Sequence, residues 1–220
     1  AERAVEFQVP VEIIGNHAVI NPKDYTPPDS VISKFNEVRK RFDELFVYVG
    51  GDANVVGADL RVLVPSLLLT PGNWGLIPRY HPTNLDRLDS QGIRKLSEVW
   101  DKLLDPIRNR IVCCDNGFSD DIAFLADACF SAGSASMSMA ISAGKPVVAI
   151  KTPECMAWLR ESMVEEIPWV ALGAATAIEK PQNLRSLLIP LPEEVRNKFL
   201  PLRPLKAVEF IENFFLLVKQ

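Results

Sequence analysis

The stretch ADACFSAGSASMSMAISAGKPVVAI, residues 126–150, places two short apolar runs on either side of a segment of small and hydroxyl side chains. Apolar runs of this length are typical of buried strands. Between them, residues 134–143 have the composition of a short helix, which Gly144 ends and Pro146 prevents from continuing. The stretch therefore predicts a strand, a helix and a second strand in succession.

The same alternation continues through most of the chain. Strands are predicted at 45–54, 74–84 and 110–118, with a further short strand and turn at 169–178. Helices are predicted from Pro28 or Asp29 onward, at 58–69, from Asn84 as N-cap through Leu103, at 119–127 with Ser119 as cap, at 157–167 and at 204–219. Strands that alternate with helices predict an α/β, Rossmann-like parallel sheet with helices on both faces.

Two regions follow from this pattern. Residues 1–27 are predicted to be an N-terminal strand and a linker of the interdomain type, and residues 28–220 a Rossmann-like domain. The apolar segment 204–219 is expected to be a C-terminal docking helix. Contact of this segment with a membrane surface or with a partner is the alternative.

Composition excludes several classes. The formal net charge of -4 argues against nucleic-acid binding. The four cysteines form no C-x-x-C pair and are expected to be buried, reduced thiols, which favours the cytoplasm. No apolar run reaches the length of about 20 residues that a membrane span needs. No clustered ligands predict a metal, and no cofactor is expected.

Three glycine-bearing loops are predicted at the carboxyl ends of strands, where parallel sheets bind ligands. They contain Gly50, Gly51 and Asp52, then residues 115–118, then Ser131 to Ser136. In the third loop, the N–H groups at a helix start can hold a phosphate, and Gly133 allows a close approach. Small residues here serve close packing of helix against strand equally well, so both interpretations stand.

Two common nucleotide-binding signatures are absent. Lys145 is followed by Pro146 and lacks the spacing of a P-loop, and no G-x-G-x-x-G follows the strand at 45–50. A P-loop enzyme and a standard NAD-binding protein are therefore not expected.

The run FSDDIAFLAD, followed by a strand, SAGSAS, a short helix and GKPVVAI, resembles the C-terminal, donor-binding half of GT-B glycosyltransferases. It is most similar to the branch that holds the N-acetylglucosaminyltransferase of peptidoglycan lipid II synthesis, with the UDP-N-acetylglucosamine 2-epimerases as cousins. The resemblance covers residues 9–188, and IIGNHAVI is similar to the family's interdomain linker.

The resemblance implies a binding site for a nucleotide-sugar. Gly50 and Gly51 would face the cleft with Asp52 beside them, and residues 118–122 would frame the base. The residues that it implies as ligand contacts are Gly50, Gly51, Asp52, Arg79, His81, Phe118, Asp121, Ile122, Ser131, Ala132, Gly133, Ser134, Ser136 and Glu154. The segment 131–136 would hold the diphosphate, the His81 element would lie near donor phosphate, and Glu154 would touch sugar hydroxyls. For His81 a capped turn, and for Glu154 an exposed loop acid, are the alternatives.

The chain departs from the family's sequence pattern at two points. The family carries a glutamate for the ribose hydroxyls five residues before the G-K-P glycine, where this chain has Met139, a thioether that accepts almost no hydrogen bonds. The spacing between Asp127 and Gly133 is also one residue short. The half that supplies the acceptor site and the catalytic base is not represented, so no catalytic residue is assigned.

Three functions follow as expectations. The first is the donor-binding domain of a glycosyltransferase that uses a nucleotide-sugar, implied to be UDP-linked, and works with an acceptor-binding domain or subunit. The second is a non-catalytic partner domain of GT-B type, which Met139 and the apolar tail favour. The third is half of a UDP-sugar epimerase or hydrolase.

Overall fold

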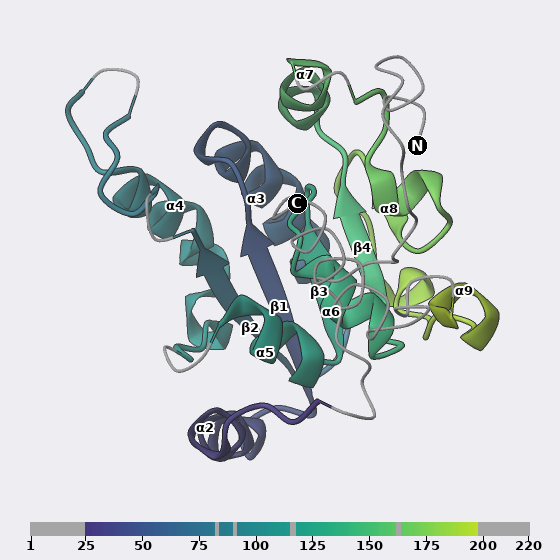
Figure 1. Cartoon of the computed structure of the whole chain (residues 1–220). Coiled ribbons are helices and arrows are strands. Elements are labelled where there is room, and N and C mark those ends of the chain that lie inside the picture. Colours follow the sequence, from purple (N-terminus) through teal and green to yellow (C-terminus); the bar gives the residue numbers. More distant parts are fainter. Residues whose placement is uncertain (1–24, 82–83, 90–91, 115–117, 162–163, 198–220) are drawn as a thin grey trace, which may run out of the picture.

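The computed structural model describes residues 25–81, 84–89, 92–114, 118–161 and 164–197. Its centre is a sheet with the strand order β2-β1-β3-β4-β5, in which every neighbouring pair is parallel (Figure 1). The strands are β1 (Glu44–Gly50), β2 (Trp74–Tyr80), β3 (Ala128–Ser131), β4 (Val147–Ile150) and β5 (Thr176–Ile178). The predicted α/β, Rossmann-like class is confirmed.

Alternate residues of β1 supply two separate cores. Leu45, Val47 and Val49 pack into one hydrophobic cluster. Phe46 and Tyr48 pack into the other. Because successive side chains of a strand point to opposite faces, the continuous apolar run at 45–49 requires cover on both faces of the sheet.

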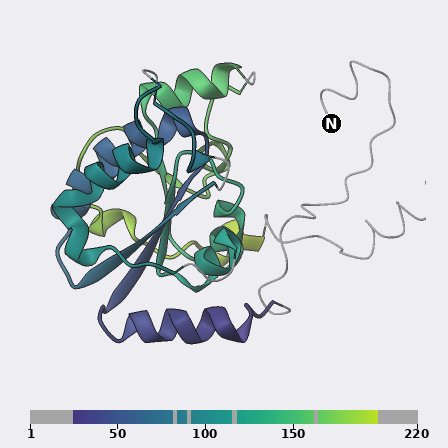
Figure 2. The same ribbon diagram turned by 90° about the vertical axis from the view of Figure 1, so that its left-hand side faces the viewer.

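Helices supply that cover on both faces (Figure 2). On one face lie α2 (Asp29–Arg39), α5 (Ser119–Leu125) and α6 (Met137–Ser142). On the other lie α3 (Ala53–Leu68), α4 (Leu96–Leu104) and the 3-10 helix η2 (Asp105–Arg110). The remaining elements are α7 (Pro153–Glu161), α8 (Pro168–Ala171), η3 (Arg185–Leu187) and α9 (Glu193–Asn197).

The strand predicted at 110–118 is reduced to a single bridge. Ile111 pairs in parallel with Leu76 of β2, and the Val112 amide donates to the Leu76 carbonyl at 2.8 Å. With this bridge outside β2, the chain order across the sheet is that of a Rossmann fold, 3-2-1-4-5-6. The direction of winding reverses between β1 and β3. This switch point is where open α/β sheets bind ligands.

The helix predicted from Asn84 onward is wrong over its first half, since α4 begins only at Leu96. In the preceding segment the Asp89 side chain accepts from the amides of Ile93 and Arg94, and Leu88 forms an antiparallel bridge with Lys95. Gly92 adopts φ 68°, a conformation that favours glycine. A local turn has therefore replaced the helix that the apolar spacing predicted.

Other predicted boundaries also differ. Helix α3 begins at Ala53 rather than near residue 58, because the Asp52 side chain caps it by accepting from the Asn54 amide at 2.8 Å. Phe118, not Ser119, is the N-cap of α5. Cys113 is exposed, contrary to the expectation of buried thiols, whereas Cys114, Cys129 and Cys155 are buried.

The expectations for the two ends of the chain lie outside the described residues. They are residues 1–24 of the strand and linker predicted at 1–27, and the helix predicted at 204–219. Within the described ranges, no helix has the length and apolarity required to traverse a lipid bilayer.

Candidate functional site at the carboxyl edge of the sheet

The strand register brings the predicted loops together. Gly50 pairs with Tyr80, Tyr48 with Phe130, and Ser131 with Ala149. The segments after β1, β2, β3 and β4 therefore leave the sheet at the same edge. Of the predicted site residues, Gly51, His81, Gly133 and Glu154 all follow these strand ends. The ligand-binding crevice expected of this fold lies between the segments after β1 and β3.

The glycines after β1 have different surroundings. A Cβ atom on Gly50 would lie 2.9 Å from Val56 Cγ2 and 3.1 Å from Tyr80 Cδ1, so packing alone accounts for this glycine. A Cβ atom on Gly51 would meet no atom within 4 Å. The Asn84 side chain donates to the Gly51 carbonyl at 2.8 Å and holds this loop to the segment after β2. Gly51 thus lies in a fixed loop beside open space.

Ser131 is the anchor of the loop after β3. Its buried hydroxyl donates to the Val49 carbonyl at 2.7 Å. It also accepts from the amides of Ser134 at 3.0 Å and Gly133 at 3.3 Å. One donor and two acceptor positions are the full capacity of a hydroxyl. Ser131 therefore joins the ends of β1 and β3 and has no capacity left for a ligand in this arrangement.

Helix α6 begins at Met137, three residues later than predicted, because residues 134–136 form turns instead of helix. The Ser136 amide donates to the Ser134 hydroxyl at 3.3 Å. This bond and the one from the Gly133 amide are both longer than the usual 2.9–3.0 Å of an N–H···O bond, and are correspondingly weak. An anion could accept hydrogen bonds from these two amides and displace only these two weak bonds.

Trp158 lies beside the candidate site and was not predicted from the sequence. It lies on α7, is half-buried, and its ring would be 3.7 Å from a Cβ atom on Gly133. The Cys155 thiol of the same helix lies 3.6 Å from the Ala132 carbonyl. Helix α7 thus packs along one side of the loop at 131–133. The sequence shows that Trp158 lies one helical turn after Glu154. It does not show that this side chain contacts Gly133, because the pairing of β3 with β4 sets that contact.

Lys151 is the second residue that was missed. It follows β4 directly, and Ser131 pairs with Ala149, so Gly133 and Lys151 lie equally far beyond the same rung of the sheet. Its Nζ lies 2.6 Å from Glu166 Oε2, and this hydrogen bond raises the lysine pKa and lowers the Glu166 pKa. The Lys151 ammonium also lies 4.0 Å from Glu179 Oε1, so the cation at the end of β4 is paired with two acids.

The residues predicted to frame a base are used largely within the fold. Ile122 is fully buried in the core. The buried Asp121 carboxylate accepts from the Phe118 amide at 2.8 Å and from the Tyr25 hydroxyl. Phe118 is 81% exposed, and it is the side chain of this group that is accessible to a ligand.

The remaining predicted residues also have partners. Arg79 donates to the Cys114 carbonyl at 2.7 Å, and the His81 carbonyl accepts from the Asn84 amide at 2.9 Å. Glu154 forms an ion pair with Arg61 at 3.8 Å on the surface. Which of these residues contacts a ligand stays a prediction.

Met139 lies where the resemblance to GT-B enzymes implied a ribose-binding glutamate. It lies in the second position after the start of α6 and is only 2% exposed. A carboxylate here would be buried in apolar surroundings, which is costly without a partner. An apolar side chain such as methionine therefore suits this buried position.

A buried acid lies beneath the same edge. Asp59 of α3 is fully buried, and its Oδ2 accepts from the Tyr48 hydroxyl at 3.0 Å. Within the described part of the chain, neither Asp59 Oδ1 nor the buried Tyr80 hydroxyl has a hydrogen-bond partner. Desolvation raises the Asp59 pKa well above its ordinary value, although the bond from Tyr48 opposes this. Asp59 is therefore a candidate for a neutral carboxylic acid.

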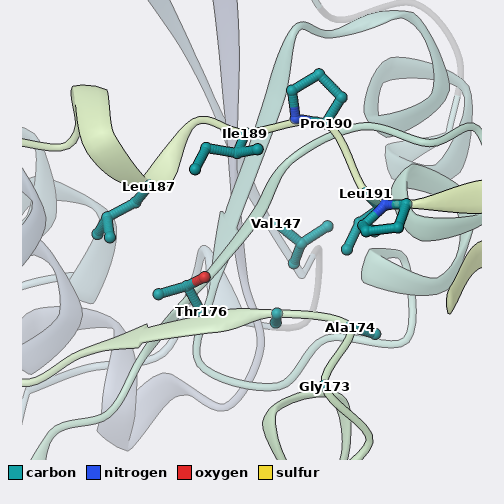
Figure 3. Close-up of a pocket in the computed structure, with 10 residues that line it drawn as sticks. Val147, Gly173, Ala174, Thr176, Leu187, Ile189, Pro190 and Leu191 are labelled. Carbon is teal, nitrogen blue, oxygen red and sulfur yellow. The ribbon is translucent and has the colours of Figure 1, made fainter.

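Two further features concern the described residues alone. No group of three or more histidine, cysteine, aspartate or glutamate side chains is placed to hold a metal ion. A pocket of about 190 Å³ lies at the opposite, amino ends of β4 and β5 (Figure 3). Its lining side chains are mostly apolar, and its place at the other end of the strands separates it from the loops of the carboxyl edge.

Comparison with known proteins yields few similarities. No family model and no curated protein matches the sequence. Among solved structures, a glycosyltransferase is similar: the structure described as the glycotransferase of kitacinnamycin has a TM-score of 0.42 and 14% identity. The match covers 86% of this chain and 45% of that one, so the present chain spans less than half the length of the protein that it matches.

Proposed function

We propose that this chain is the donor-binding domain of a GT-B-type glycosyltransferase. Its ligand would be a UDP-sugar, and a second domain or subunit would bind the acceptor. One observation carries the proposal: the switch point between β1 and β3 is flanked by Gly51 and Gly133, and neither glycine has a neighbouring atom closer than ordinary contact to its missing side chain. The resemblance of residues 118–150 to the family supports the choice of ligand.

The binding chemistry would rest on the backbone. The amides of Gly133 and Ser136 make long bonds to neutral hydroxyls, both at 3.3 Å. Hydrogen bonds to a charged acceptor are roughly twice as strong as those to a neutral one. A diphosphate oxygen would therefore replace the hydroxyls on these two amides without opening the buried bond from Ser131 to Val49.

The contribution to catalysis would be electrostatic. As the sugar leaves, negative charge grows on the diphosphate, and fixed N–H donors stabilise it without having to reorient. Lys151 would add positive charge at the next strand end, reduced by its pairing with Glu166. The base that activates the acceptor would come from the other domain.

Calorimetric titration with UDP, a UDP-sugar and uridine tests the proposal. The reasoning predicts saturable binding of the two diphosphates and none of uridine. Ser136→Asp should abolish binding by repulsion, while the fold is retained, because an acid at the N-cap of α6 is favourable. Gly133→Trp should also abolish it by filling the space beside Trp158.

Leu68→Trp provides the matched control. This exposed leucine ends α3, which runs back from the carboxyl edge, so the same indole is added away from the site. Its binding should equal that of the wild type. Absence of binding by the folded wild type would reject the donor-binding function. It would favour the second candidate, a non-catalytic partner domain, for which the buried Met139 is the specific observation.

A further inference from the structure

The pocket at the amino ends of β4 and β5 is large enough for an aromatic side chain. Its walls are Thr176 and the backbone before it on one side and the segment from Leu187 to Leu191 on the other, with Val147 between them (Figure 3). Its volume of about 190 Å³ exceeds the roughly 150 Å³ of a protein cavity that binds benzene. One phenyl ring would therefore fit.

The surface around this pocket is apolar and exposed. Ile189, in the pocket wall, is 66% exposed, and Leu172, next to Gly173 of the lining, is 60% exposed. Large exposed apolar side chains beside a pocket are typical of a surface that binds another segment or protein.

The chain itself provides the occupant. Leu191 and Pro192 line the pocket and lead directly into α9, the last described element. Helix α9 is held in place because its Arg196 lies against Gly144 and the Leu191 amide donates to the Gly144 carbonyl at 3.4 Å. The described chain therefore ends one short helix after the pocket wall. Segment 1–24, in contrast, joins the described domain at Tyr25, which contacts Asp121 and Phe124 of α5.

The sequence after α9 fits the pocket. More than half of the residues at 198–220 are apolar, and Val208, Ile211, Phe215 and Val218 follow the spacing of one helical stripe. Phe210 follows Asn197 by 13 residues, about 40 Å of extended chain, which is ample for a return to the pocket.

We propose that the C-terminal segment 204–219 docks intramolecularly on this surface and inserts a phenylalanine ring between β5 and the segment at 187–191. The docked segment would cover Ile189 and Leu172 and extend the apolar face of the domain. Since the pocket lies at the amino edge of the sheet, the docked segment leaves the carboxyl edge open. The proposal is independent of the proposed function.

Disulfide cross-linking in the full chain tests the proximity. In a Cys113→Ser background, which removes the exposed thiol, Ile189→Cys is combined in turn with Glu209→Cys, Glu212→Cys and Asn213→Cys. These positions flank the apolar stripe and leave its anchors intact. At least one pair should cross-link within a single chain at least about ten times faster than with Leu69→Cys, a leucine of comparable exposure at 57%. Equal rates from both sites, links only between chains, or no link would overturn the proposal.

A second pair of variants tests whether the segment needs an empty pocket in order to dock. Thr176→Trp places an indole in the pocket, on a strand that tolerates aromatic residues, whereas Thr176→Val keeps the shape and leaves the space open. Trypsin cleavage after Lys206 should accelerate at least about tenfold in the tryptophan variant, a factor equivalent to about 1.4 kcal/mol. The valine variant should match the wild type. Unchanged cleavage in Thr176→Trp would refute docking.

Discussion

Replacement of Asp59 by asparagine should make the protein more stable at neutral pH and leave its stability unchanged in acid. The carboxyl group is fully buried, and one of its oxygens has no hydrogen-bond partner in the described part of the chain. Burial disfavours the charged form and raises the pKa of this group well above its ordinary value. Asparagine has nearly the same shape as a protonated aspartic acid and cannot ionise.

The stability of the wild type falls with rising pH because the folded chain binds one more proton than the unfolded chain. Below about pH 4, the folded and the unfolded wild type both hold the proton, and the two proteins should be equally stable. Above that pH the unfolded chain releases the proton while the folded chain keeps it, so the free energy of unfolding falls by about 1.4 kcal/mol per pH unit. The fall ends when the pH reaches the folded-state pKa. Asparagine at this position is free of this loss.

Thermal unfolding of both proteins from pH 4 to pH 8 measures the effect. For a protein of this size, 1 kcal/mol shifts the Tm by about 2–4 °C, so the Tm advantage of Asp59→Asn should grow by about 3–6 °C per pH unit. Asp101→Asn, at an exposed position of α4, is the matched control because water already solvates that carboxylate. A Tm difference between wild type and Asp59→Asn that stays constant across the pH range would refute the reasoning, since Asp59 would then be ionised in the folded state.

Three other predictions concern the carboxyl edge and the thiols. Ser131→Ala removes three hydrogen bonds and leaves the Val49 carbonyl unpaired, so urea titration should show a loss of about 1–3 kcal/mol in unfolding free energy; no loss would mean that these bonds contribute nothing. Gly50→Ala should cost about 1–3 kcal/mol through its clash with Val56, whereas Gly51→Ala, beside open space, should be close to neutral; equal Tm values for the two variants would contradict the packing assignment. A thiol reagent should modify one cysteine, Cys113, rapidly in the native protein, and rapid modification of two or more would contradict the described burial.

The pKa values of the buried thiols also limit their reactivity. Burial raises the pKa of the Cys129 and Cys155 thiols to about 12, so that neither forms the reactive thiolate near neutral pH. The sequence did not separate Cys113 from these residues. It lies beyond the bridge at Ile111, where the predicted strand fails to continue and leaves the side chain at the surface.

The sequence by itself determined the class of fold. The continuous apolar run at 45–49 needs cover on both faces, and its alternation between two cores is a consequence of strand geometry that any sheet would impose. The stripe Val31, Phe35 and Val38 predicted α2, which the structure confirms. Gly144, with φ 72°, ends the helical segment where the sequence predicted. Each of these signals is local, so it is readable without knowledge of the rest of the chain.

The tertiary structure alone decided how the loops use their polar groups. Ser131 meets Val49 across 82 positions of sequence, and no pattern in the serine-rich loop distinguishes that anchored hydroxyl from its neighbours. The leucines at 85 and 88 have helical spacing, yet the Asp89 turn and the bridge to Lys95 place them at the surface. Hydrogen bonds between distant segments set these outcomes, and periodicity carries no information about them because it records only which face of an element is apolar.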